Sequence, residues 1–239
     1  MIISNSHKFV FIHIHKCAGT SITKALDPVL VWNDVICGST QYGARVNNAF
    51  YKRFKLHKHS LAHEVRDTIG PEKWASYFTF TFVRHPFSRA VSLYTYIDKL
   101  VKQQGFNRQL RLLKRPQRRK EIWRWSLTQA YLESRNFSDF IRHRGFQEDI
   151  SARPQFFWIA DHEKKTPIVN FIGKVETLHQ DFETITTQLE LGDLALGQHN
   201  LSTKTPQSWQ SYYQSEQDYD VIRKLHAVDF EKLGYEHWV

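Results

Sequence analysis

A short turn near the N-terminus combines residue types that bind anions. Residues 9–21 read FVFIHIHKCAGTS, so an apolar run leads directly to a lysine, a cysteine and several small residues. The candidate binding residues are Lys16, Cys17, Ala18, Gly19, Thr20 and Ser21. Gly19 lets the backbone approach a ligand closely, and amides at the start of a following helix point toward an anion. The charge of Lys16 favours this interpretation over an ordinary capped turn between a strand and a helix.

The order of residues in this turn separates it from the usual nucleotide-triphosphate loop. That loop requires the pattern G-x-x-x-x-G-K-[ST]. The nearest spacing match, Gly38 to Gly43, continues without the lysine. Cys17, beside Lys16 and a helix N-terminus, has the setting of a reactive thiolate, but a small loop residue is the simpler interpretation.

A second candidate for binding an anion follows another β-rich run. Residues 82–94 read FVRHPFSRAVSLY, with Arg84 at the expected strand end and Arg89 and Ser92 on the expected helix. Arg84 and Ser92 can hold one phosphate, because a guanidinium offers paired donors and a hydroxyl completes the shell. For Arg84 taken alone, a buried ion pair with a carboxylate is the alternative.

A histidine-rich stretch supplies candidates for a general base. An apolar stripe within residues 61–69 predicts a helix with Ser60 as its N-cap. His59 then lies just before the helix N-terminus, where the dipole favours a neutral imidazole that can accept a proton. His59 is therefore the candidate base, with His57 and His63 as alternatives. The plainer interpretation is that these are surface histidines in a chain with 13 histidines.

Strands that alternate with helices position these residues. The expected strands are 9–14, 77–83 and 168–175, and the expected helices are about 20–26, 86–100 and 178–189. This alternation predicts an α/β fold with a parallel β-sheet flanked by helices. Ligands bind beyond the carboxyl ends of such strands, so the junctions at Lys16 and Arg84 should meet at one edge of the sheet.

Length predicts residues 1–239 to be one domain, or one domain with a large insertion. The 33 Lys and Arg against 24 Asp and Glu give a net charge of +9, which favours anionic partners. The two cysteines do not indicate a disulfide framework, and no transmembrane segment or signal peptide is evident, so we expect a cytoplasmic protein. The histidines and Cys17 complete no known ligand spacing, so no metal is expected.

The two junctions together resemble those of the PAPS-dependent sulfotransferases, especially the branch that includes carbohydrate (glycan) sulfotransferases. Residues 16–21 look like that family's loop for the 5′-phosphosulfate. Residues 84–92 fill its R-x-P-x-x-R-x-x-S pattern, whose first Arg and last Ser, here Arg84 and Ser92, hold the 3′-phosphate of the donor. The histidines at 57 and 59 are similar to the H-x-H of glycan 2-O-sulfotransferases, where one of the pair is the base.

Later stretches agree with the same family more weakly. These are FIGKVE at 171–176, a loop that begins at His199-Asn200 and DFEKLGY at 229–235. The resemblance spans most of the chain except about 98–150. It implies that residues 1–239 are a single sulfotransferase domain, in which about 98–150 form a basic, mostly helical insertion. His15 departs from the pattern, because relatives often carry proline before the lysine, and this change should affect loop rigidity more than chemistry.

The resemblance implies a P-loop-like sulfotransferase fold and PAPS as the donor. An acceptor hydroxyl, expected on a carbohydrate or glycolipid, would attack sulfur in line. Lys16 would stabilise the leaving oxygen and His59 would take the proton. A metal is not required, because such transfer depends on positioning and charge stabilisation.

Two other functions stay open from the residues alone. A nucleotide kinase would carry a lysine after the loop glycine and an acid for Mg²⁺. A basic nucleic-acid-binding module would use the segment 99–124, although no nucleic acid is expected as a partner. That segment is otherwise a solvated face or a surface for an acidic acceptor.

Overall fold

The structure is a computed structural model that describes residues 1–110, 124–161, 163, 165–197 and 208–236. The chain forms two compact units. The first comprises Met1–His85 with Gln155–Leu201, and the second comprises Pro86–Pro154 with Ser202–Val239. Among the described residues, no helix is both long enough and apolar enough to cross a membrane.

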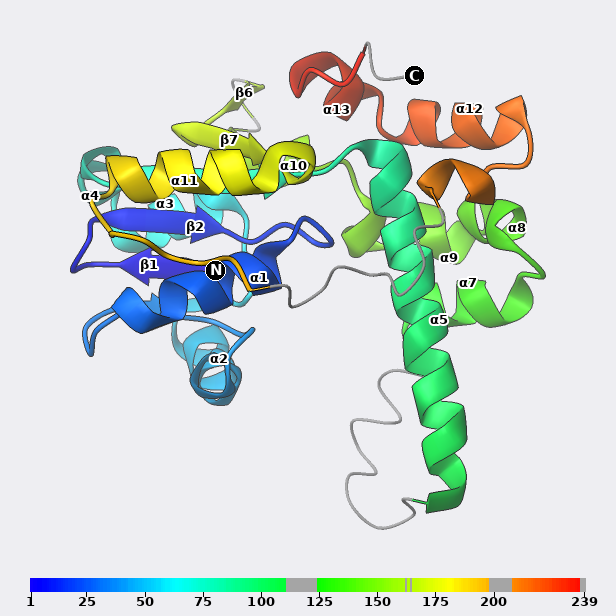
Figure 1. Cartoon of the computed structure of the whole chain (residues 1–239), viewed down its shortest axis with the longest axis horizontal. Coiled ribbons are helices and arrows are strands. Elements are labelled where there is room, and N and C mark those ends of the chain that lie inside the picture. The colour runs from blue at the N-terminus through cyan, green and yellow to red at the C-terminus, as the bar shows by residue number, and fades with distance from the viewer. Residues whose placement is uncertain (111–123, 162, 164, 198–207, 237–239) are drawn as a thin grey trace. The chain divides into compact units, whose positions relative to one another are not determined.

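A five-stranded sheet organises the first unit (Figure 1). Its strands in spatial order are β3 (Val35–Ile36), β1 (Ile2–Ser4), β2 (Phe9–Ile12), β4 (Phe78–Val83) and β7 (Phe171–Lys174). The three strands β2, β4 and β7 are parallel, so the turn after β2 and the turn after β4 begin at the same edge. This confirms the α/β class and the common edge that the sequence predicts.

The sheet is mixed, which corrects the expectation of a parallel sheet. Strand β1 pairs antiparallel with both β2 and β3. The N-terminal run therefore contains a hairpin before the strand that the sequence predicts. The carboxylate of Asp34 accepts hydrogen bonds from the amides of Asn5 (2.6 Å) and Ser6 (3.0 Å), and Lys8 has a φ of 52°. These contacts reverse the chain before Phe9.

Helices cover both faces of this sheet. They are α1 (Gly19–Leu26), α2 (Gln41–Phe54), α3 (Ala62–Ile69), α4 (Pro71–Ser76), α10 (Phe156–Ile159) and α11 (Leu178–Gln188), with 3₁₀ turns at Asp27–Val29 and Val175–Thr177. A small ribbon joins β5 (Ala160–Asp161) to β6 (Thr166–Pro167). Side chains of α1 and α11, such as Ile22 and Phe182, pack on Phe9, Phe11 and Phe80 of the sheet. Figure 1 shows α11 in front of the sheet and α3 behind it.

The helix over 61–69 forms, but its start differs from the prediction. It begins at Ala62 with Leu61 as the N-cap, and the amide of Leu61 donates to the carboxylate of Glu64 (2.8 Å). Ser60 does not cap it. The hydroxyl of Ser60 instead accepts a hydrogen bond from the amide of His57 (2.9 Å) and shapes the preceding turn.

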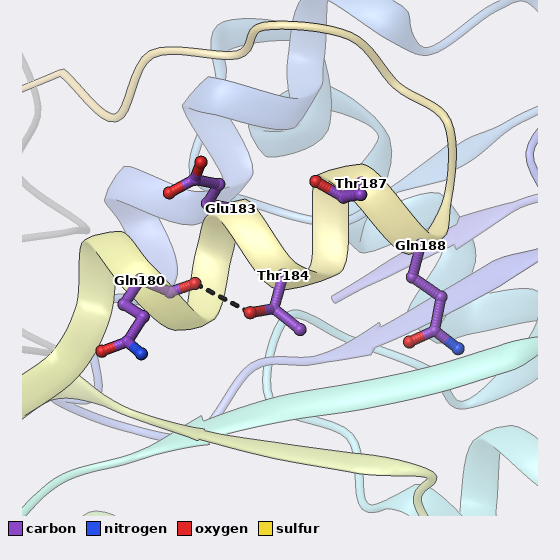
Figure 2. A pocket seen from close by; sticks show the side chains of 5 residues that line it. All are labelled: Gln180, Glu183, Thr184, Thr187 and Gln188. Atoms are coloured by element: carbon purple, nitrogen blue, oxygen red, sulfur yellow. Dashed lines mark hydrogen bonds between the residues drawn. The ribbon is translucent and has the colours of Figure 1, made fainter.

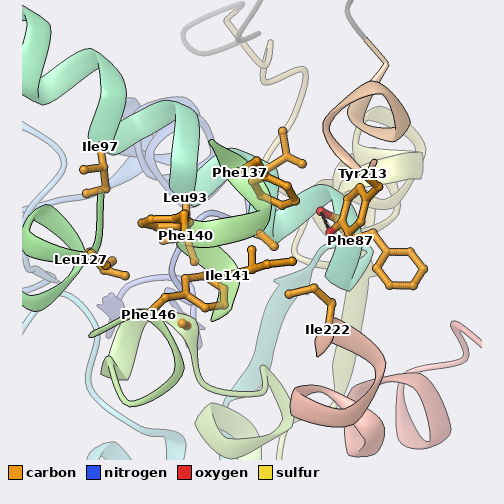
Figure 3. Close-up of a cluster of buried hydrophobic side chains, with 14 residues drawn as sticks. Phe87, Leu93, Ile97, Leu127, Phe137, Phe140, Ile141, Phe146, Tyr213 and Ile222 are labelled. Carbon is orange, nitrogen blue, oxygen red and sulfur yellow. Dashed lines mark hydrogen bonds between the residues drawn. The ribbon is translucent and has the colours of Figure 1, made fainter. Parts of the chain in front are cut away.

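The second unit is helical around its own apolar core. Its elements are α5 (Pro86–Leu110), α7 (Ser126–Glu133), α8 (Phe137–Arg142), α9 (Arg144–Gln147), α12 (Glu216–Leu225) and α13 (Ala227–Lys232), with 3₁₀ turns at Ile150–Ala152 and Trp209–Tyr212. Figure 3 shows the core, in which Phe87 and Leu93 of α5 gather with Phe140, Phe146 and Ile222. Helix α5 confirms the helix that was expected from Pro86, and it continues further along the chain.

Candidate active site

The backbone of the turn after β2 is arranged to present amides to an anion. Lys16 and Ala18 both have left-handed conformations, with φ of 65° and 56°. Ala18 precedes α1, and its carbonyl accepts from the amide of Ser21 (2.9 Å). Within the described part of the chain, the amides of Gly19 and Thr20 have no acceptor. Such a turn at a helix N-terminus makes an anion-binding concavity.

Gly19 has a packing role that the sequence did not reveal. A Cβ placed on Gly19 would lie 2.2 Å from Cδ2 of His13. The ring of His13 is buried, with 3% of the residue exposed. A side chain at position 19 would therefore displace this ring, in addition to any effect on the approach of a ligand.

The turn after β4 is held by two side chains from distant parts of the sequence. The side-chain amide of Gln155 donates to the carbonyl of Arg84 (2.8 Å) and accepts from its amide (2.7 Å). The carboxylate of Glu176 accepts from the amide of His85 (2.8 Å). Gln155 thus satisfies both backbone groups of Arg84, as a neighbouring strand would do. These two hydrogen bonds fix the backbone of Arg84 at the end of β4.

Gln155 also connects the two turns. The thiol of Cys17 donates to Oε1 of Gln155 (3.0 Å), and both residues are buried. Cys17 therefore has a structural contact, which agrees with its interpretation as a loop residue. Sequence reasoning missed Gln155. The only signal was a single amide before the aromatic run FFWIA at 156–160.

The remaining residues of the R-x-P-x-x-R-x-x-S pattern lie in the second unit. Ser92 is half-buried on α5, and its share in holding a phosphate stays a prediction. Arg89 is 1% exposed, and its guanidinium donates to the carbonyls of Ser151 (2.7 Å) and Arg153 (2.9 Å). This arginine supports the backbone just before Gln155.

His59 lies in the turn between α2 and α3, against the end of β2. Its Nδ1 is 2.7 Å from the carbonyl oxygen of His13. Its ring stacks on His15 with a centroid distance of 3.5 Å and an interplanar angle of 18°. Trp158 donates from Nε1 to the carbonyl of His59 (3.2 Å) and packs edge-on against His15. Because His15 directly precedes Lys16, these contacts hold His59 beside the turn that contains Lys16.

The hydrogen bonds assign tautomers to two of the three candidate bases. A carbonyl only accepts, so Nδ1 of His59 carries a proton and the neutral ring has its lone pair on Nε2. The amide of His59 donates to Nδ1 of His57 (3.0 Å), so neutral His57 carries its proton on Nε2. Nε2 of His59 can therefore accept a proton, whereas Nε2 of neutral His57 already carries one.

Burial keeps these rings neutral. Burial is the largest cause that lowers the pKa of His59 well below its ordinary value, followed by the nearby His15 and Lys58. The pKa of His57 is also lowered, again mainly by burial. The neutral state expected for His59 is supported, but removal from water is its main cause rather than the helix dipole. No three His, Cys, Asp or Glu residues in the described ranges are grouped to hold a metal ion.

Other predicted features lie elsewhere. His199 and Asn200 lie outside the described residues, and so do residues 111–123 of the basic segment 99–124. A surface hollow on α11 is lined by Gln180, Glu183, Thr184, Thr187 and Gln188 (Figure 2). All five come from one helix and include a single ionisable group, so this hollow lacks the cations and histidines that the two turns provide.

The family comparison agrees with this arrangement. The model described as the sulfotransferase family matches residues 1–236, and the chain therefore belongs to that family. It is a PAPS-dependent sulfotransferase, an enzyme that transfers a sulfuryl group to an acceptor bearing a hydroxyl. No curated protein and no solved structure matches the chain.

Proposed function

We propose that this sulfotransferase acts on a carbohydrate or glycolipid hydroxyl, with His59 as the general base and Lys16 as the group that stabilises the leaving oxygen. The single observation that carries the proposal is the position of His59. Its ring is stacked on the residue before Lys16 and has its lone pair on Nε2.

The donor set of the first turn fits a phosphosulfate. It consists of the cation of Lys16, the amides of Gly19 and Thr20, and the hydroxyls of Thr20 and Ser21, with no Asp or Glu in the sequence of residues 9–26. PAPS supplies the activated sulfuryl group when it is bound. Lys16 would place its charge where the bridging oxygen becomes negative, which lowers the barrier most because that charge develops only in the transition state.

Arg84 and Ser92 would hold the 3′-phosphate that distinguishes PAPS from simpler adenine nucleotides. Support for Arg84 comes from the way Gln155 fixes its backbone at the end of β4. A guanidinium anchored in this way can meet two phosphate oxygens with little loss of side-chain freedom.

His59 would accept the proton of the acceptor hydroxyl as sulfur is attacked. A base needs an unprotonated nitrogen within hydrogen-bond reach of the hydroxyl. Nε2 of His59 satisfies the first condition. The hydrogen bond from Nδ1 to the carbonyl of His13 fixes the ring and stabilises the imidazolium that forms.

Binding measurements test the donor site directly. Calorimetry should show that adenosine 3′,5′-bisphosphate binds far more tightly than AMP, and Arg84→Ala should remove most of that difference. Arg135→Ala is a control, because that side chain is 90% exposed on the second unit. Equal affinities for the two nucleotides would contradict the 3′-phosphate site. A glycan array with radiolabelled PAPS would then test the acceptor class, and modification of no glycan would contradict it.

A further inference from the structure

The ring of His15 contacts an imidazole and an indole that come from distant parts of the sequence. It stacks on the His59 ring, with a centroid distance of 3.5 Å and an interplanar angle of 18°. The Trp158 indole meets it edge-on, with a centroid distance of 5.6 Å and an interplanar angle of 70°. His15 is half-buried and follows the buried Ile14. Its ring is therefore placed by its neighbours at the point where the chain leaves the core for Lys16.

The stack completes the positioning of the His59 ring. Nδ1 of His59 lies 2.7 Å from the carbonyl oxygen of His13, and this hydrogen bond fixes one atom of the ring. A ring held at one atom can still swing, which moves Nε2 on its far side. The flat contact with His15 opposes that motion, because close-packed ring faces cannot tilt without overlap or loss of contact. The orientation of the His59 imidazole therefore depends on His15.

The titratable groups that face His59 are all basic. They are His13 and His15 at the end of β2, His57 and Lys58 in its own turn, and the amino group of Met1. Burial is the largest cause that lowers the pKa of His59, and His15 is the next. Because two adjacent imidazoles disfavour a second positive charge, a proton on His15 makes His59 a weaker base. A neutral His15 ring instead offers its face to the imidazolium that catalysis would form on His59.

From these contacts we propose that His15 is a positioning residue for the reaction, and that its neutral ring holds the His59 imidazole in the one orientation that a general base needs. The proposal rests on the function proposed above for His59, because His15 acts through that ring and touches neither donor nor acceptor. Relatives often carry proline before the lysine, and proline has no aromatic face. This support therefore belongs to the present chain rather than to the family pattern.

Histidine NMR of the full chain tests the proposal without an acceptor. Two-bond ¹⁵N–¹H spectra report the tautomer of each imidazole and the pH at which it takes up a proton, and His59→Asn assigns the signals of His59. His15→Phe keeps a flat ring and removes the charge, so the pKa of His59 should rise but stay below its ordinary value, because burial remains. His15→Ala also opens one face of the ring to water. The pKa of His59 should then rise further, and both tautomers should appear.

Transfer of the sulfuryl group separates the effect of orientation from that of charge. On the glycan array with radiolabelled PAPS, His15→Ala should reduce the label about tenfold, because a misoriented base slows the reaction. His15→Phe should lose no more than about two-fold, because the stack is kept. Binding of adenosine 3′,5′-bisphosphate should be the same in both variants as in the unaltered chain, since neither changes Lys16.

Substitutions of His179 are the matched controls. His179 is exposed on α11, so its replacement by phenylalanine or alanine removes a histidine without disturbing the stack. Both variants should leave the array label and the titration of His59 unchanged.

Three results would overturn the proposal. The first is the same titration midpoint of His59 in the unaltered chain, His15→Phe and His15→Ala. The second is an equal amount of array label from His15→Ala and His15→Phe. The third is a loss of bisphosphate affinity in His15→Ala as large as the loss of label, which would assign His15 to the support of the turn at Lys16 instead.

Failure of the proposed function gives a different result. Full labelling by His59→Ala would remove the proposed base, whatever the two His15 variants do. An array that takes no label from the unaltered chain would contradict the acceptor class, and the NMR titrations would then decide the proposal for His15 alone.

Discussion

Replacement of Gln155 by leucine is the sharpest test of how the two turns are held together. Leucine keeps a similar volume but removes the amide that pairs with both backbone groups of Arg84 and accepts from Cys17. An unsatisfied buried polar group costs about 1–3 kcal/mol. The variant leaves the amide and carbonyl of Arg84 and the thiol of Cys17 without this partner. Arg84 is half-buried, so water can replace part of the lost hydrogen bonding. We therefore expect the free energy of unfolding to fall by about 2–3 kcal/mol, which is less than three full penalties.

The same change should also weaken donor binding. Without Gln155, the backbone that carries Arg84 is no longer fixed, so the preference for adenosine 3′,5′-bisphosphate over AMP should decrease. A residue that only stabilised the fold would leave this preference unchanged in the folded protein. Urea unfolding and calorimetry of the two nucleotides measure the two effects separately.

A matched variant shows what an ordinary glutamine contributes. Gln147 is exposed on α9, and its side chain makes one long hydrogen bond, to the carbonyl of Ile141 (3.3 Å). Gln147→Leu should change the free energy of unfolding by less than about 0.5 kcal/mol. If Gln155→Leu were equally mild and kept the nucleotide preference, Gln155 would not position Arg84.

Three further predictions concern the first turn and the base. Gly19→Ala should lower the free energy of unfolding by about 1–3 kcal/mol, because its Cβ would overlap the buried ring of His13; an unchanged urea midpoint would count against that contact. Lys16→Ala should lower kcat by about 10²–10³-fold. Lys8 is an exposed lysine that also has a positive φ, so Lys8→Ala is the control and should leave kcat unchanged. Equal effects of the two substitutions on kcat would refute the role of Lys16. The pKa of His59 lies well below its ordinary value, so below about pH 6.5 the unfolded chain takes up a proton that the folded protein does not. Stability should therefore fall between pH 7.5 and 5.5, and His59→Asn should reduce that fall in urea unfolding; an identical pH dependence in the variant would show that the ring is not held neutral.

The sequence predicted the elements that depend on local periodicity. The apolar spacing in α11, the proline at the start of α5 and the alternation along β2 each reflect the geometry of a single helix or strand. The order of strands and helices then placed the turns at Lys16 and Arg84 at one edge of a sheet. The motifs at these turns also indicated the sulfotransferase family, because they are contiguous in the chain.

The same reasoning failed where a distant residue decides the local structure. The hairpin before β2 depends on the carboxylate of Asp34, which is 29 residues from Asn5. Ser60 is not the predicted N-cap of α3, because its hydroxyl accepts a hydrogen bond from the amide of His57 instead. Neither contact has a periodic pattern that a sequence can display.

The composition and motifs of the chain indicated which residues are candidates for binding an anion and which histidines are candidates for the base. Tertiary structure decided how those residues are used. Gln155 meets Arg84 across 71 residues and Cys17 across 138 residues. The tautomer of His59 is set by the carbonyl of His13, 46 residues away. Side-chain amides and imidazoles act through directional hydrogen bonds, and their partners are fixed only when the sheet brings separate segments together.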